Sequence, residues 1–321
     1  MNETPNDVQA ADELYAKYKL LKQEIGKVII GQHAAVDILF NAILANGHVL
    51  LVGVPGLAKT LLVRTFAEVL DLDFNRIQFT PDLMPGDITG SEILNEKREF
   101  QFLRGPIFSN IILADEINRT PPKTQAALLE AMQEKSVTVN GQSHLLPKPF
   151  FVLATQNPIE QEGTYPLPEA QLDRFMFNVI LTYPTFSEEL DVVRSTTGNL
   201  KPELNKILHD RDILLYQELV RKVPVADNVM EYAVKLVSKT RPNTPAATTQ
   251  INDFIEFGAG PRAGQFLILG AKAHALMHGK YSPDIDDVKA IALDVLRHRL
   301  IRNYKAEAEG ISTEAIIQGI L

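Results

Sequence analysis

A glycine-rich loop between an apolar run and a helical segment is the first candidate for chemistry. A helical pattern (LLVRTFAEVL) begins at Leu61, and the apolar run HVLLVG leads into the loop Gly53-Val54-Pro55-Gly56-Leu57-Ala58-Lys59-Thr60. The loop nearly matches G-x-x-x-x-G-K-[ST], in which backbone N–H groups and a helix N-terminus hold phosphate oxygens. We expect residues 53–61 to bind a nucleotide, with Lys59 at the β- and γ-phosphates and the Thr60 hydroxyl on Mg²⁺.

The loop departs from that pattern at one position, where Ala58 replaces the glycine before the lysine. An alanine fits there only if its φ is negative and the phosphate leaves room for one methyl group. The alternative is a plain Gly/Pro turn between a strand and a helix. Because strand, loop and helix follow one another in the required order, we favour the phosphate loop.

Two adjacent acids end a later apolar run. The run Asn110–Asp115 (NIILAD) is followed directly by Glu116. At the carboxyl edge of a sheet, Asp115 could hold Mg²⁺ together with Thr60, and Glu116 could take a proton from an attacking water. Alternatively, the two acids only open the turn before Thr120-Pro121-Pro122, a good helix start. The phosphate loop upstream favours the catalytic interpretation.

A polar amide follows a third apolar run, in the sequence Ala154-Thr155-Gln156-Asn157-Pro158. The Asn157 amide could position the attacking water or contact the γ-phosphate. An Asn-Pro pair alone is more often a simple turn. Its place at the end of the strand after the acidic pair favours a role in the site.

The elements that must position these residues follow from the hydrophobic pattern. Short apolar runs separated by helical segments are typical of a parallel sheet buried on both faces. Five such runs occur: His48–Gly53, Asn75–Phe79, Asn110–Asp115, Phe150–Thr155 and Met176–Leu181. Helical spacing occurs before them, at 8–26 and 33–46, and after them, with no further strand-like run, at 186–198, 211–222, 227–240, 262–278 and 284–300. We predict an α/β core over residues 1–187 and an all-α domain over 188–321.

The amino-acid composition excludes several classes of functional site and of protein. The 321 residues are 45% hydrophobic and 22% charged and include no cysteine, which excludes disulfides, Cys-ligated metals and thiol catalysis. A net charge of −8 disfavours a broad basic footprint for nucleic acid. The N-terminus is acidic and polar, and no apolar run approaches the ~20 residues of a membrane span. We therefore expect a cytoplasmic protein without membrane insertion.

Together these motifs resemble the AAA+ ATPases, and within them the MoxR family. The resemblance extends from Ile29 to Gly310, and an alanine before the lysine looks typical of this branch. Its most specific segments are GVPGLAKT at 53–60, DEINR at 115–119, ATQNP at 154–158 and LPEAQLDRF at 167–175. It implies a five-stranded sheet in the order 5-1-4-3-2, a helical lid over the nucleotide, and a hexameric ring with sites between subunits.

The resemblance also implies roles for individual residues. Asn157 resembles sensor 1, Arg174 the arginine finger that reaches a neighbour's γ-phosphate, and Arg262 in GAGPRA sensor 2. Ile30 and Gly31, within Ile29-Ile30-Gly31-Gln32, would lie near the adenine. Alternatively, Arg174 pairs with Asp173 or Glu169, and Arg262 is a solvated residue of a first helical turn. Arg119 and Lys123 are further candidates for the finger.

Two inserted segments fit the same resemblance. Residues 87–103 indicate a strand pair around Asn95-Glu96-Lys97, and residues 136–146 a hairpin with a turn at Asn140-Gly141. Both resemble the insert and hairpin of related ring ATPases, where such loops face the pore or a partner. The alternative is that both are surface decoration.

The implied function is ATP hydrolysis with Mg²⁺ that remodels or matures a protein client in a chaperone-like way, beside a partner with a von Willebrand factor A domain. One rival is a nucleic-acid motor or loader, which the net charge disfavours. Another is a nucleotide-gated scaffold with little turnover, which the combination of Glu116, Asn157 and Arg174 disfavours. A small-molecule kinase would need an acceptor site, and none is visible. The sequence does not name the client.

Overall fold

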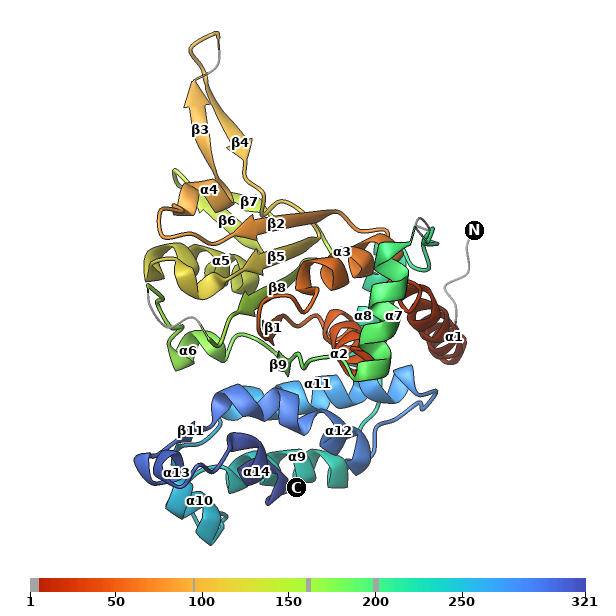
Figure 1. Ribbon diagram of the computed structural model, residues 1–321, viewed down its shortest axis with the longest axis vertical. Coiled ribbons are helices and arrows are strands. Elements are labelled where there is room, and N and C mark those ends of the chain that lie inside the picture. Colours follow the sequence, from red (N-terminus) through yellow and green to blue (C-terminus); the bar gives the residue numbers. More distant parts are fainter. Residues whose placement is uncertain (1–5, 95, 160–162, 199–201) are drawn as a thin grey trace.

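The computed structural model describes residues 6–94, 96–159, 163–198 and 202–321. An α/β part stands over a group of helices, and a two-stranded hairpin projects from the end far from those helices (Figure 1). The main sheet has five strands: β1 (Val49–Val52), β2 (Phe74–Gln78), β5 (Ile111–Asp115), β8 (Phe151–Gln156) and β9 (Phe177–Ile180). All five lie where apolar runs predicted them.

The strand order is β2-β5-β8-β1-β9, and every neighbouring pair is parallel. Read from the β9 edge, this is the predicted order 5-1-4-3-2, which is confirmed. Alternate residues of a strand point to opposite faces. Accordingly, Ile111 and Leu113 pack in one hydrophobic cluster, and Ile112 and Ala114 pack in another on the opposite face. The continuous apolar runs therefore reflect burial on both faces.

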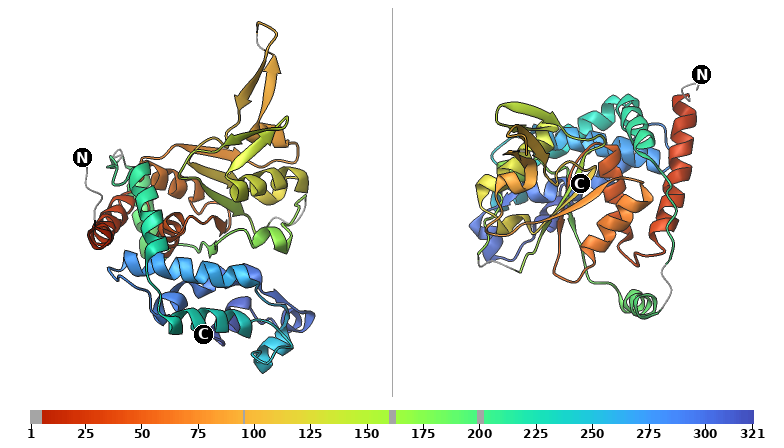
Figure 2. Two further views of the ribbon diagram at one scale, coloured as in Figure 1. Left: turned by 180° about the vertical axis from the view of Figure 1, so that it is seen from behind. Right: turned by 90° about the horizontal axis from the view of Figure 1, so that it is seen from above.

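Different helices cover the two faces. One face packs against α1 (Asp7–Ile25), α2 (His33–Leu44) and α3 (Lys59–Val69). The other packs against α4 (Pro85–Thr89) and α5 (Pro122–Glu134). The short α6 (Glu169–Leu172) leads into β9. Figure 2 shows this layering from behind and from above.

Both predicted hairpins are confirmed. β3 (Gly90–Leu94) pairs antiparallel with β4 (Phe100–Arg104) and forms the projecting hairpin of Figure 1; the expected turn residue Asn95 lies outside the described residues. β6 (Ser136–Val139) pairs with β7 (Gln142–Leu145). Asn140 and Gly141 between them both have positive φ, 48° and 81°, as a type I′ turn requires.

The remaining chain is mainly helical, as predicted. Its helices are α7 (Phe186–Thr197), α8 (Asp210–Lys222), α9 (Asp227–Lys239), α10 (Thr249–Phe254), α11 (Pro261–Met277), α12 (Ile285–Leu296), α13 (Tyr304–Ala308) and α14 (Thr313–Gln318). The expectation of no strand after β9 is wrong, because β10 (Ile255–Phe257) pairs antiparallel with β11 (Ile301–Arg302). Strands of two or three residues are too short to produce an apolar run. In the described part of the chain, no helix is long and apolar enough to cross a bilayer.

The helical part shares its hydrophobic core with the sheet. Tyr216 of α8 and Leu267 of α11 belong to the same buried cluster as Phe40 of α2 and Phe177 of β9. A Cβ at Gly270 would lie 2.5 Å from Ile291 Cδ1 of α12 and 3.1 Å from Phe177 Cζ of β9, so the missing side chain lets α11 approach both elements. Asn41 Nδ2 also donates to the Gly270 carbonyl at 3.0 Å. Helix α11 is therefore packed directly onto β9 and α2.

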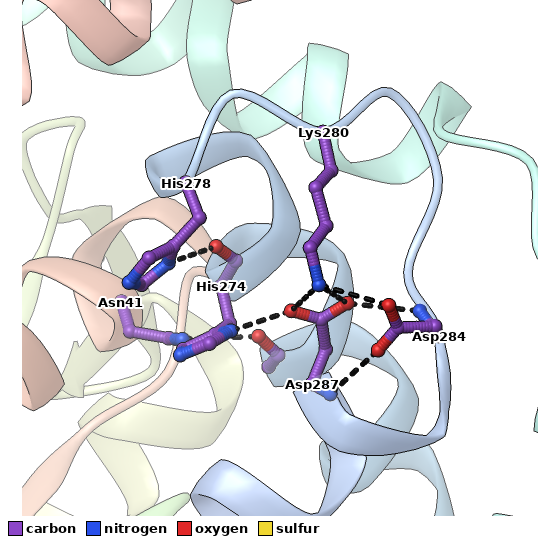
Figure 3. A network of polar contacts seen from close by, with 7 residues as sticks. Asn41, His274, His278, Lys280, Asp284 and Asp287 are labelled. Carbon is purple, nitrogen blue, oxygen red and sulfur yellow. Dashed lines mark hydrogen bonds and ion pairs between the residues drawn. The ribbon is translucent and has the colours of Figure 1, made fainter.

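Helix α11 is joined to α12 by a polar cluster around a buried carboxylate (Figure 3). Asp287 pairs with His274 at 2.7 Å and with Lys280 at 3.2 Å. Burial alone would raise the pKa of Asp287, but hydrogen bonds from His274, the Asp284 N–H and Lys280 lower it to about 2. The rings of His274 and His278 stack at 4.1 Å. This histidine pair therefore contributes to helix packing.

Candidate functional site

The phosphate-loop sequence connects β1 to α3, as predicted. Gly56 has φ 89°, a conformation open to glycine at little cost, and the helix begins at Lys59. Ala58 also lies in the left-handed region, with φ 52° and ψ 28°, so the expectation of a negative φ there is wrong. A single L-residue can take this conformation at a cost of roughly 1–2 kcal/mol when the surrounding loop imposes it.

Because Ala58 has a left-handed conformation, we expect opposite results from two substitutions at this position. Ala58→Gly should raise stability slightly, because glycine relieves the positive-φ strain, and should leave nucleotide affinity within about three-fold. Ala58→Val should abolish detectable nucleotide binding, because a β-branched residue is strained at positive φ and crowds the loop. Calorimetric titration with ATP, with circular dichroism to verify folding, measures both. Normal binding by folded Ala58→Val would mean that the loop does not surround the phosphates.

A pocket of about 460 Å³ brings together residues from three distant segments. Lys59 and Thr60 come from the loop, Asp115 and Glu116 from the end of β5, and Asn157 from just beyond β8. The rest of its lining is Pro55, Gly56, Leu57, Ala58 and Leu61. Gly53 and Val54 are not part of that lining, but the Gly53 carbonyl accepts a hydrogen bond from Lys59 Nζ at 2.6 Å. The carboxyl ends of parallel strands thus converge as predicted.

Asp115 is buried and both of its carboxylate oxygens are engaged. Oδ1 accepts from the Thr155 hydroxyl at 2.6 Å. Oδ2 accepts from Arg76 twice, from Nε at 3.0 Å and from Nη2 at 2.6 Å. The Thr155 hydroxyl also accepts from the Glu116 N–H at 2.9 Å, so this buried threonine bridges the two acids.

Glu116 is held from two sides in a left-handed conformation, with φ 56° and ψ 50°. Its Oε2 accepts from Gln78 Nε2 at 2.8 Å and from Arg119 Nη1 at 3.0 Å. Non-glycine residues with positive φ concentrate at functional sites, where surrounding contacts keep them in place. Arg119, a weaker candidate for the finger, contacts Glu116 of its own chain in this structure.

The amide of Asn157 is buried at the edge of the same pocket. Its Oδ1 accepts from the Ile159 N–H at 3.2 Å. That bond fixes the oxygen as the acceptor end, so the NH₂ end is the one that can donate to a phosphate oxygen or a water. The geometry is suited to the role predicted for Asn157.

An apolar pocket of about 170 Å³ adjoins the phosphate loop. It shares Gly56, Leu57, Ala58 and Leu61 with the phosphate pocket, and Ile30 lines it. The remaining lining residues are Val28, Ile29, Gln32, Leu62, Pro184, Val192, Ser195 and Thr196. Gly31 does not line this pocket. It lies against α7 instead, where a Cβ at this position would be 3.0 Å from Glu188 Oε1. The position and apolar lining suit a planar base whose phosphates extend toward Lys59.

Arg174 and Arg262 line neither pocket. Arg262 lies in the first turn of α11 and donates to Asp173 Oδ2 at 2.9 Å. Half-buried Arg174 forms no side-chain hydrogen bond or ion pair with the described part of the chain, so pairing with Asp173 or Glu169 is not observed. The sequence-based roles of both arginines stay predictions.

Asp173 links two arginines of the helical part to the strand that follows Arg174. Besides Arg262, it accepts from Arg299 Nε at 2.8 Å, and the Arg299 side chain is only 2% exposed. Arg299 also donates to the carbonyls of Asp173 and Phe175. Burial lowers the pKa of Arg299 to about 10, against the opposing effect of the Asp173 carboxylate.

Asp173→Ala should therefore lower the free energy of unfolding by about 2–4 kcal/mol, because it leaves the buried Arg299 guanidinium without its carboxylate. Asp191→Ala is the matched control: it breaks a pair with Arg194 in which both side chains are more than half exposed, and should cost less than about 1 kcal/mol. Urea unfolding of both variants measures the difference. Equal, small effects would contradict a stabilising role for Asp173.

The residues expected to hold Mg²⁺ fit that ion by donor chemistry. The Thr60 hydroxyl and the Asp115 carboxylate line the same pocket, and Mg²⁺ takes oxygen ligands of these kinds. In phosphate-loop ATPases, a carboxylate and a hydroxyl group beside the loop hold the Mg²⁺ that binds with the nucleotide.

Comparison with known proteins agrees with this geometry. The family described as "ATPase family associated with various cellular activities (AAA)" matches residues 48–177, and the family described as "AAA lid domain" matches residues 247–320. YeaC of Bacillus subtilis (strain 168), named an uncharacterized protein, is 46% identical over 301 residues, 93% of this chain and 91% of YeaC. Chaperone MoxR1 of Mycobacterium tuberculosis (H37Rv) is 44% identical over 299 residues, 93% of this chain and 79% of MoxR1.

The chain belongs to the MoxR family of AAA+ ATPases. A crystal structure of a proposed ATPase from Cytophaga hutchinsonii ATCC 33406 matches this MoxR-family fold with a TM-score of 0.91 at 47% identity, covering 97% of this chain and 95% of that one. The family resemblance drawn from the sequence is confirmed, as are the sheet order and the helical lid.

Sequence reasoning missed three polar residues around the acidic pair of this MoxR-family chain: Arg76, Gln78 and Thr155. It considered Asp173 only as a partner of Arg174, whereas Asp173 pairs with Arg262 and Arg299. Arg76 and Gln78 alternate along β2, so two polar side chains on one face of an expected strand were a usable signal. Thr155 ends an apolar run and carries no such signal. Asp173 and Arg262 are far apart in the sequence, and only the packed fold shows that they form an ion pair.

Proposed function

We propose that this MoxR-family chain hydrolyses ATP with Mg²⁺ and uses the turnover, as part of a ring of identical subunits, to remodel protein clients. The single observation that carries the proposal is the convergence of Lys59, Thr60, Asp115, Glu116 and Asn157 on one pocket beside an apolar pocket. The word chaperone in the name of the MoxR1 relative supports protein clients.

Each residue of the pocket has a distinct task in this proposal. Backbone N–H groups at the start of α3 and the Lys59 ammonium bind the phosphates, while the apolar pocket binds the base. Glu116 accepts a proton from the attacking water, and Asn157 orients that water or the γ-phosphate. Mg²⁺, when bound by Thr60 and Asp115, would neutralise charge on the phosphate oxygens.

The proposal that subunits form a ring depends on Arg174. It lies outside its own chain's phosphate pocket, and its guanidinium has no partner in the described residues, which is suited to contact with a neighbouring nucleotide. A partner with a von Willebrand factor A domain and a cytoplasmic location stay part of the proposal on the strength of the family resemblance alone.

A nucleic-acid motor is the rival, and the basic residues at 297–305 do not favour it. Arg297 pairs with Asp294 and Glu314, and Arg299 pairs with Asp173. Arg302 donates to the Ile311 carbonyl and Lys305 pairs with Asp253. These cations are already engaged within the chain, and the net charge of −8 opposes a phosphate backbone.

The test is a three-part assay on purified full-length protein. Mg²⁺-dependent phosphate release should occur and should be absent in Lys59→Ala, which loses a charge-assisted phosphate contact. ATP should change the yield of refolding of a chemically denatured model protein, again only with Lys59 intact. Single-stranded DNA should not bind at physiological salt. Absence of ATP turnover in the wild type would overturn the proposal, and tight, salt-sensitive DNA binding without an effect on refolding would favour the rival.

A further inference from the structure

Arg76 occupies the carboxylate that the proposed function assigns to Mg²⁺. The arginine lies on β2, the edge strand, directly beside β5. Its Nε and Nη2 lie 3.0 and 2.6 Å from Asp115 Oδ2, while the Thr155 hydroxyl occupies Oδ1. Both oxygens of Asp115 therefore already accept hydrogen bonds, and Oδ2 accepts the two that come from the guanidinium.

The arginine and a metal ion would compete for the same carboxylate. A Mg²⁺ held by Asp115, either directly or through one of the waters that this ion usually keeps, would need a carboxylate oxygen that now accepts from another donor. Two positive charges at one carboxylate also repel. The Arg76 side chain is 46% exposed whereas Asp115 is 12% exposed, so the arginine is the partner that can move away into solvent.

Arg76 is also connected to the catalytic acid. Its Nη2 donates to Gln78 Oε1 at 2.5 Å, and Gln78 Nε2 donates to Glu116 Oε2 at 2.8 Å. One chain of hydrogen bonds thus extends from the carboxylate of Asp115, through two side chains of β2, to Glu116. Moving Arg76 removes the contact that orients the Gln78 amide.

We propose that Arg76 is a built-in counter-cation that competes with Mg²⁺ for Asp115, so that binding of Mg²⁺-nucleotide must displace it. This inference rests on the proposed function, because it concerns the same nucleotide site. Its consequence is a site that stays closed to free Mg²⁺ and opens when nucleotide and metal arrive together. Displacement of Arg76 also releases Gln78, which ties metal loading to the hydrogen bonding of Glu116.

The closing experiment measures the Mg²⁺ requirement of nucleotide binding with fluorescent mant-ADP, which avoids turnover. In Arg76→Met, the Mg²⁺ concentration for half-maximal binding should fall by about 10-fold or more, because a charge-assisted competitor is lost. Arg76→Lys keeps the positive charge but lacks the planar guanidinium. Its Mg²⁺ concentration for half-maximal binding should therefore lie between those of the wild type and Arg76→Met. Arg64→Met on α3 is the matched control: it removes the same charge from an exposed side chain and should change the value by less than about two-fold.

A second readout needs no nucleotide. Mg²⁺ alone should raise the thermal midpoint of Arg76→Met, whose Asp115 lacks its counter-ion, and should leave the wild-type midpoint unchanged. If Arg76→Met binds mant-ADP but needs as much Mg²⁺ as the wild type, or more, the proposed competition between Arg76 and Mg²⁺ is refuted and the proposed function stands. If the wild type binds no Mg²⁺-mant-ADP at all, both the competition and the proposed function are refuted.

Discussion

Glu116→Gln should lower ATP turnover by roughly 10²–10⁴-fold while ATP affinity stays within a few-fold. An amide has the shape of the carboxylate but cannot take a proton from water. Its oxygen can still accept from Gln78 and Arg119, the two groups that hold Glu116 in its left-handed conformation, so the pocket should keep its geometry. Steady-state phosphate release and equilibrium ATP binding, measured on the same preparation, separate the two quantities.

The matched control is Glu130→Gln, which makes the same chemical change at an exposed position of α5 and should leave both quantities unchanged. Wild-type turnover in Glu116→Gln would remove Glu116 from the role of general base. A parallel loss of ATP affinity would indicate that the substitution disturbs the pocket, and the assignment would then require a different acid.

Arg174→Ala should reduce turnover by about 10³–10⁵-fold if its guanidinium acts on a neighbour's γ-phosphate, since arginine fingers supplied by a second chain have effects of that size. Two further results should follow. Specific activity of the wild type should rise with protein concentration. Mixing inactive Arg174→Ala with inactive Glu116→Gln should restore part of the activity, because some interfaces then combine an intact Glu116 with an intact Arg174.

Arg211→Ala, at an exposed position of α8, controls for loss of surface charge and should behave as the wild type. The decisive contrary result is concentration-independent turnover with no rescue between chains that are shown to mix. Arg174 would then act within its own subunit or have only a packing role.

The sequence predicted the parts of the site that depend on strand ends. Because the strands are buried on both faces, their apolar runs were visible, and the polar residues that end them had to meet at one edge of the sheet. This placed Asp115 and Glu116 at the phosphate loop before any contact was known. The strand order itself came from the family resemblance.

Contacts between elements could not be predicted in the same way. Arg76 and Gln78 reach the acidic pair only because β2 lies beside β5, a neighbour relation that hydrophobic spacing does not encode. The positive φ of Ala58 depends on how the whole loop closes, so the residue type suggested the opposite sign. Asp173 meets Arg299 through packing of the helical part onto the core.

The hydrophobic cluster shared by the sheet and the helical part restricts how the molecule can move. Swinging α11 away from β9 as a rigid hinge would expose Phe177, Leu267 and their buried neighbours to water, at roughly 2 kcal/mol for each large side chain. Sliding of packed helices by an ångström or two keeps such surfaces covered. Any displacement of the lid during a nucleotide cycle should therefore be a small shear that keeps these side chains buried, and the hydrogen bond from Asn41 to the Gly270 carbonyl limits how far α11 can slide past α2.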